Sequence, residues 1–185
     1  MSLKDIEPVR QPSALTNSEI DIAFAREMPA EFRKTLGSEI YFSEPIVAVV
    51  PRGHELYDPN PIQLRQLSSE RIILYSREAA PKLFDEIIAM CKWAKFSPNI
   101  VDTPRQEQTV LAMVEAGEGI ALVPSSLRNL RPNSVYFRTL REKKCQVNVF
   151  LAWRQGEPDA IRDGFLSLLR KNRPNMERSI KETTS

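Results

Sequence analysis

Polar side chains suited to binding a small anion occur at two places in the chain where an apolar strand gives way to a helix. They are Ser76, Arg77, Lys82, Arg105, Gln106 and Glu107. A helix N-terminus presents unpaired N–H groups and the positive end of the helix dipole, and both attract anions. Taken singly, each side chain is explained as well by helix capping or by solvated surface. As a group beside two helix N-termini, they predict a lining that binds a carboxylate.

The elements that must hold these side chains lie between Arg71 and Ser126, where the sequence alternates strand, helix, strand, helix, strand. Such alternation predicts a parallel sheet with a crevice at the carboxyl ends of its strands. The first helix is expected to begin near Pro81. For the second helix we expect Thr103 as the N-cap, Pro104 in the first helical position and Gln106 completing a capping box. Both helix N-termini would then point into the same crevice.

The rest of the chain predicts further strands and helices, which makes the fold α/β. We expect strands at Lys4–Glu7, Ile20–Ala25, Ser38–Pro51, Val135–Leu140 and Gln146–Trp153, and helices at Pro12–Thr16, Pro61–Leu67 and Asp159–Leu169. The near-continuous apolar run Ile20–Ala25 is typical of a parallel strand that is buried on both faces. The charged segment Arg170–Ser185 is expected to be a frayed or disordered tail.

Composition narrows the class of protein. The 185 residues are 42% hydrophobic and 27% charged, which suits a globular chain with a real core. The net charge of +2 is too small for a self-sufficient nucleic-acid binder. No apolar stretch reaches the ~20 residues that a membrane span needs, so we expect no membrane partner. The cysteines, Cys91 and Cys145, are far apart, which favours a reducing compartment and therefore the cytoplasm.

The sequence shows no pattern typical of a catalytic site or of a metal site. A hydrolytic triad or a zinc site needs several His, Cys or carboxylate groups brought together, and the single histidine, His54, lies in a predicted turn. There is no GxxxxGK phosphate loop. Gly117 and Gly119 end a helix and open a strand, which is the reverse of a dinucleotide fingerprint. We therefore expect no enzyme activity, no cofactor and no metal site.

Several segments of the chain line up with one protein family. They are Ala14-Leu15 with Ile20–Phe24, Glu44-Pro45 with Val47–Pro51, His54, Ile72–Tyr75, Phe96 with Pro98, and Val114–Pro124 with its Ala116, Gly117 and Gly119. Together they closely resemble the C-terminal effector-binding domain of LysR-type transcriptional regulators, over almost the whole chain up to about Arg154. Tyr75 ahead of Pro81, and Arg105 with Gln108, most resemble the subgroup that senses benzoate or muconate.

The resemblance implies two Rossmann-like lobes, as in type II periplasmic binding proteins. Lobe I would comprise residues 1–45 plus 152–185, and lobe II residues 46–151, with two crossing segments as a hinge. A small organic acid, aromatic or dicarboxylic, would bind between the lobes and change the geometry of an oligomer that bends promoter DNA. Only a difference in affinity for two arrangements can drive such a change.

The family pattern also predicts what this chain lacks. Family members carry a strand and a helix ahead of the segment that corresponds to Lys4–Glu7, and we expect lobe I to lack both. The N-terminal winged helix-turn-helix that contacts DNA in the family is likewise expected to be absent. A lobe without its first strand exposes a sheet edge and apolar surface, which predicts self-association to a dimer or tetramer, or strand exchange.

Carried over position by position, the resemblance implies a set of effector-binding residues. They are Pro8, Val9, Ser76, Pro81, Lys82, Leu83, Arg105, Gln106 and Glu107. Muconate-sensing members have threonines where this chain has Pro8 and Val9, and an aromatic residue where it has Leu83. Arg26 and Glu44 match a second aromatic-acid site of one member, but Phe42 replaces an arginine of that site.

Other functions remain open at this level. A solute-binding protein of a transport system would share the fold, and would need a signal peptide or a lipid-anchor cysteine. A small α/β enzyme would need a nucleophile and a base, and turnover of an acid substrate would reveal one. A crevice that binds nothing is a further alternative.

Overall fold

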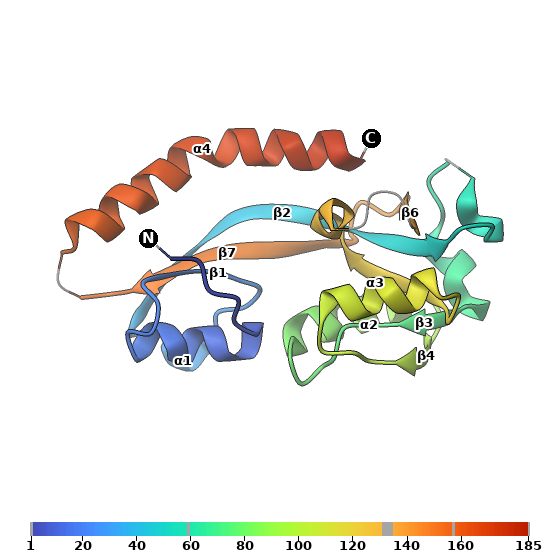
Figure 1. Cartoon of the computed structure of the whole chain (residues 1–185), viewed down its shortest axis with the longest axis horizontal. Coiled ribbons are helices and arrows are strands. Elements are labelled where there is room, and N and C mark those ends of the chain that lie inside the picture. The colour runs from blue at the N-terminus through green and yellow to red at the C-terminus, as the bar shows by residue number, and fades with distance from the viewer. Residues whose placement is uncertain (1, 59, 131–134, 157, 185) are drawn as a thin grey trace. The chain divides into compact units, whose positions relative to one another are not determined.

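The computed structural model describes residues 2–58, 60–130, 135–156 and 158–184, and the chain divides into two compact units (Figure 1). Unit 1 comprises Met1–Ser43 and Asn148–Ser179, and unit 2 comprises Glu44–Val147 and Ile180–Ser185. Strands β2 (Leu36–Pro51) and β7 (Gln146–Arg154) run from one unit into the other. The lobe limits expected from the sequence, 1–45 plus 152–185 and 46–151, stay a prediction.

Unit 2 is built on a mixed sheet. Besides the end of β2, its strands are β3 (Arg71–Ile73), β4 (Asn99–Asp102), β5 (Ile120–Pro124) and β6 (Val135–Thr139), with α2 (Pro81–Trp93) between β3 and β4 and α3 (Glu107–Glu115) between β4 and β5. Strand β3 pairs in parallel with both β4 and β5, while β2 runs antiparallel to β5 and β6. The predicted strand–helix alternation and its parallel strands are thus confirmed.

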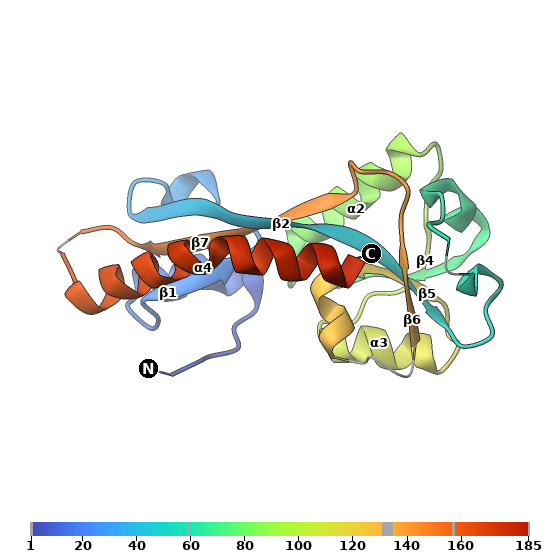
Figure 2. The ribbon, with the colours of Figure 1, turned by 90° about the horizontal axis from the view of Figure 1, so that it is seen from above.

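The two helices cover opposite faces of this sheet, as Figure 2 shows. On one face, Leu83, Ile87 and Cys91 of α2 join a buried cluster that includes Ile46 and Ala48. On the other face, α3 packs with Val110, Leu111 and Val114 against the alternate residues of β2. Because both faces of the sheet are covered, its central segments Ile46–Val50, Ile72–Ile73 and Ile120–Val123 are apolar and buried, as in parallel sheets, whereas β4 at the edge is mostly exposed.

Short 3₁₀ helices complete the connections. They are η1 (Pro8–Arg10) and η2 (Ala30–Phe32) in unit 1, and η3 (Glu55–Tyr57), η4 (Leu64–Ser69) and η5 (Ser125–Asn129) in unit 2. The turn from α3 to β5 depends on two glycines. Gly117 has a φ of +81°, as predicted for the residue that ends the helix. A Cβ at Gly119 would lie 2.6 Å from the backbone oxygen of Arg71, so that position needs a glycine for close approach.

Unit 1 contains α1 (Gln11–Thr16), β1 (Ile22–Ala25) and parts of β2, β7 and α4 (Ala160–Thr184). Its core includes Leu15, Ala23, Leu36 and Ala152. Strand β1 pairs antiparallel with β7, with Ile22 opposite Trp153. Helix α4 is tied to β2 by the Tyr41 hydroxyl, which donates to the carbonyl of Leu169 at 3.0 Å.

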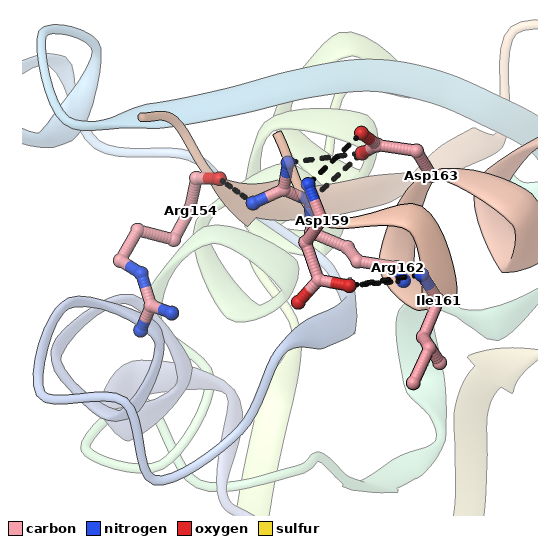
Figure 3. A network of polar contacts seen from close by, with 5 residues as sticks. All are labelled: Arg154, Asp159, Ile161, Arg162 and Asp163. Carbon is pink, nitrogen blue, oxygen red and sulfur yellow. Dashed lines mark hydrogen bonds and ion pairs between the residues drawn. The ribbon is translucent and has the colours of Figure 1, made fainter. Parts of the chain in front are cut away.

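The beginning of α4 is held by the polar network in Figure 3. One carboxylate oxygen of Asp159 accepts the backbone N–H groups of Ile161 at 2.9 Å and Arg162 at 3.0 Å, as an N-cap does. The hydrogen bond from Arg162 lowers the pKa of Asp159. The Arg162 side chain donates to the carbonyl of Arg154 at 3.2 Å and pairs with Asp163 at 2.9 Å, so it fastens the helix to the end of β7.

Two strand predictions near the N-terminus were wrong. Lys4–Glu7 forms no strand, because local groups satisfy its backbone: Gln11 donates its side-chain amide to the Ile6 carbonyl at 3.1 Å. The run Ile20–Ala25 does contain a strand, β1, but its pairing with β7 is antiparallel and its side chains alternate in burial. Phe24 is 45% exposed, so the strand is not buried on both faces.

The capping box predicted for the second helix was also wrong, since α3 begins only at Glu107 and its N-cap is Gln106. The Pro104 carbonyl accepts an N–H from Ser76 at 2.9 Å. This contact holds the chain outside the helix for longer than the sequence suggested.

The predicted frayed tail is helical instead, because α4 continues to Thr184, while Ser185 lies outside the described residues. Arg170 pairs with Glu39 at 2.9 Å, and Arg173 with Glu177 at 3.0 Å in i,i+4 spacing. Such pairs, together with the good helix propensity of Lys, Arg, Glu and Met, support a helix even in a charged segment.

Candidate functional site

The carboxyl ends of β3 and β4 continue side by side beyond the strands. The Leu74 N–H donates to the Asp102 carbonyl at 3.2 Å, and the Ser76 N–H donates to the Pro104 carbonyl at 2.9 Å. The loop that leads into α2 is therefore bonded to the loop that leads into α3. The helix beginnings that the sequence placed at one edge do lie at the same edge of the unit 2 sheet.

Ser76 organises the turn between β3 and α2. Its carbonyl accepts the N–H groups of Ala79 at 3.2 Å and Ala80 at 3.0 Å, and its hydroxyl accepts the N–H of Glu78 at 3.2 Å. The residue is only 5% exposed. A buried serine with these bonds fixes the path of the chain into the first turn of α2.

The N-terminus of α2 has the properties expected of an anion-binding end. Its N-cap, Ala80, has no side chain that could accept an N–H bond, Pro81 occupies the first turn, and that turn holds no acidic residue. The helix has 13 residues, so its dipole is well developed. The beginning of α3 is less favourable to anions, because Glu107 lies in its first turn.

The cationic side chains around this edge have carboxylate partners within the same unit. Arg105 Nη1 lies 2.7 Å from Glu78 Oε2, and Lys82 Nζ lies 3.4 Å from Glu86 Oε1. Arg77 forms a forked pair with Asp85, at 2.8 and 3.0 Å. The hydrogen bond from Arg77 lowers the pKa of Asp85, and the same bond raises the pKa of Arg77.

These acidic partners were missed in the sequence. The Lys82–Glu86 pair has the i,i+4 spacing that a helix brings together, so the sequence did contain a signal for it. Glu78 and Arg105 are 27 residues apart and meet only because Ser76 bonds to Pro104, so no local pattern could have revealed their contact.

The remaining predicted residues lie in several environments. Gln106 is exposed and Glu107 half-buried at the start of α3, whereas the Leu83 side chain is 5% exposed and packs in the core under α2. Pro8 and Val9 belong to unit 1, where they begin η1, and Val9 is 48% exposed. Unit 2 thus brings together the predicted polar residues and Pro81 at one edge.

A buried carboxylate lies at the carboxyl end of β5. Glu44 is fully buried and accepts the Ser126 N–H at 2.8 Å, together with the hydroxyl groups of Ser125 and Ser126, both at 3.2 Å. It is adjacent to this loop because Ile46 pairs with Pro124 across β2 and β5. The carboxylate caps the N-terminal end of η5 and holds β2 against it.

Other reactive groups of unit 2 are buried. Cys91 and Cys145 are free thiols in the core, and burial raises their pKa values to about 12 and about 11. Among the described residues, no cluster of three or more His, Cys, Asp or Glu side chains could hold a metal ion. None of the helices in the described ranges has the length and apolar character needed to cross a membrane.

Comparison with known proteins identifies the family, because residues 2–174 match the family described as the LysR substrate binding domain. The chain belongs to this LysR family. Its relatives include the HTH-type transcriptional regulators AlsR of Bacillus subtilis, 30% identical over 91% of this chain, and BudR of Raoultella terrigena, 30% identical over 84%. This LysR chain spans only about half of their length, 55% of AlsR and 53% of BudR.

Solved LysR structures share the fold. The BenM effector binding domain with its effector benzoate matches 100% of this chain and 81% of its own, with a TM-score of 0.79 and 21% identity. CbnR, a LysR family transcriptional regulator, matches 92% of this chain and 58% of its own, with a TM-score of 0.82 and 22% identity. These matches confirm the predicted α/β fold of the type II periplasmic-binding-protein class. The relatives are transcriptional regulators, so neither a transport protein nor an enzyme is supported.

Proposed function

We propose that this chain is the effector-sensing regulatory domain of a LysR-type transcription regulator and that its effector is a small organic acid. The observation that carries the proposal is the family match over residues 2–174. The uncapped N-terminus of α2, beside Ser76 and Arg105, is the feature of this chain that suits an acid. The benzoate that the related BenM domain binds is an acid of the same class.

In the proposed site, the acid's carboxylate meets the first turn of α2 and the Arg105 side chain. Ser76, Pro81 and Lys82 line the side toward β3, and Gln106 and Glu107 the side toward α3. Leu83 supports this turn from the core. For the other lobe we propose Pro8 and Val9, which the sequence resemblance suggested. Within the organic acids, we propose an aromatic or a dicarboxylic acid as the effector.

The proposal for the whole protein extends beyond this chain. The relatives are about twice as long, and one solved relative is full-length CbnR complexed with its target DNA. We propose that DNA is bound through a winged helix-turn-helix outside these residues, that the regulator forms a dimer or tetramer, and that it works in the cytoplasm. The proposed lobes are residues 1–45 plus 152–185, and residues 46–151. If the effector binds one arrangement of these lobes more tightly than another, it shifts the protein toward that arrangement.

A thermal-shift screen tests the proposed function. The chain is heated with benzoate, cis,cis-muconate, chlorinated muconates and a set of amino and keto acids. An acid at a hundredfold its dissociation constant stabilises the fold by about 2.7 kcal/mol, which raises the melting temperature by several degrees at this size.

The variants Arg105→Ala and Lys82→Ala are expected to reduce the shift. Arg71→Ala serves as the matched control, because Arg71 is an equally exposed cation paired with Glu118 at the amino ends of the strands. A shift that survives in Arg105→Ala and Lys82→Ala but is lost in Arg71→Ala would contradict the proposed site. The absence of a shift with every acid would contradict the proposed effector class.

A further inference from the structure

Hydrogen bonds through Ser76 hold the loops that carry Glu78 and Arg105 side by side. Ser76 bonds to Pro104 through its N–H at 2.9 Å, and its hydroxyl accepts the N–H of Glu78 at 3.2 Å. One buried serine therefore sets the position of Glu78 relative to the loop that carries Arg105. The 2.7 Å contact between the two side chains follows from this arrangement of the loops.

The same edge is close to charge-neutral in the protein without a ligand. Each of Arg77, Lys82 and Arg105 faces a carboxylate of this chain, from Asp85, Glu86 and Glu78 respectively. An incoming carboxylate thus meets cations that already have partners. Of these partners, Glu78 is the most exposed, with 82% of its side chain accessible, against 52% for Asp85 and 32% for Glu86. An exposed ion pair of this kind is weak and readily exchanged.

We propose that Glu78 is a specificity-determining residue, an internal carboxylate that occupies Arg105 until the acid effector displaces it. This inference rests on the proposed function and deepens it by naming the charge class of the effector. Displaced Glu78 stays on its loop near the ligand, where its negative charge repels further negative charge. The Coulomb energy grows in proportion to the ligand charge, so Glu78 disfavours dicarboxylates more than monocarboxylates.

The test compares Glu78→Gln with the unchanged chain, using benzoate as the monocarboxylate probe and cis,cis-muconate as the dicarboxylate probe. Exposed ion pairs contribute about 0.2–1 kcal/mol, so the expected gain in benzoate affinity is roughly 1.4- to fivefold. The gain for muconate is expected to be larger, because the repulsion by Glu78 adds to the cost of breaking the pair and grows with the charge of the ligand. Both gains should shrink as salt is added, because the pair is exposed.

Two controls separate this role from a general charge effect. Glu118→Gln removes a carboxylate of a similarly exposed pair at the opposite ends of the same strands, and should leave both affinities unchanged. In an Arg105→Gln background, Glu78→Gln should give a smaller gain, because the repulsion is relieved but there is no guanidinium to release.

Each outcome decides the inference. A gain that is larger when Arg105 is present and larger for muconate than for benzoate supports it. Equal affinities in the unchanged chain and Glu78→Gln overturn it while the proposed function stands, and so does a gain of the same size in the Arg105→Gln background. If neither probe binds either protein, removal of Glu78 does not open Arg105 to a carboxylate and the inference fails. The wider acid screen then judges the proposed function separately.

Discussion

At the scale of single residues, the buried Glu44 carboxylate makes the sharpest stability prediction. Glu44→Ala removes the acceptor of the Ser126 N–H and of two hydroxyl groups, and it leaves a cavity. We expect a loss of about 2–4 kcal/mol in the free energy of unfolding, measured by urea denaturation. Glu44→Gln keeps an acceptor for the N–H and should lose less. A loss for Glu44→Ala within the roughly 0.5 kcal/mol of an ordinary surface change would contradict this role.

Replacement of glycine by alanine is expected to change the stability of the fold in opposite directions at two positions. Gly119→Ala places a methyl group 2.6 Å from the Arg71 backbone oxygen, so strand β3 or β5 must shift, and we expect destabilisation of about 1–3 kcal/mol. Gly164→Ala lies in α4 with no atom within 4 Å, and should stabilise by about 0.5–1 kcal/mol. Thermal or urea unfolding of both variants checks the pair. A Gly119→Ala variant as stable as the unchanged chain would contradict the packing described for β3 and β5.

The sequence predicted the position of a polar residue correctly where that position depends only on its distance along the chain from a helix start. Ser76, Arg105 and Lys82 were recognised because each stands next to a predicted helix start. The acids that pair with them were missed, because the Arg105–Glu78 contact depends on a tertiary bond between two loops. Leu83, which the resemblance placed among the effector-binding residues, lies in the core beside Ile87 and Cys91.

At the scale of elements, the N-terminus of α4 predicts a dependence on pH. The pKa of Asp159 is lowered in the fold, chiefly by the Arg162 N–H, relative to an unfolded value of about 3.9. Its contribution is therefore present above that value and is lost as the pH falls through the folded pKa. The difference in urea midpoint between the unchanged chain and Asp159→Ala should be full above about pH 5 and shrink in stronger acid. A difference that is constant across this range would rule out the capping carboxylate.

The predicted helices and strands agree best with the structure where the apolar residues of a segment follow a single helical or strand pattern. The unit 2 alternation of strands and helices was recovered because the apolar runs of β4 and β5 are bounded by a proline or glycine and α2 begins at Pro81. The start of α3 was misplaced because a capping pattern is local, whereas Pro104 is held by Ser76 from another loop. The helical character of Arg170–Thr184 was missed because its charged residues were taken as solvated rather than as partners of Glu39 and of one another.

At the scale of the whole molecule, β1 predicts self-association. It stands at the end of the strand order among the described residues, and Phe24 on it is 45% exposed. We expect sedimentation at micromolar concentration to show a dimer or a larger species. Phe24→Ser should weaken association roughly tenfold or more, since an apolar side chain of this size contributes about 1.5–3 kcal/mol when buried. Leu130→Ser, which is 46% exposed in unit 2, is the matched control, and a monomeric unchanged chain would contradict the prediction.

The central claim is that a small carboxylate binds where α2 and α3 begin. The most direct measurement is a two-dimensional amide NMR titration of the chain with benzoate, and with each acid that raises its melting temperature. The account predicts that the largest shifts fall on the backbone amides of Lys82, Leu83 and Gln106, while those of Arg71 and Glu118 at the far ends of the strands stay in place. Saturable shifts confined to the Arg71 and Glu118 end, or no shift with any acid, would contradict it.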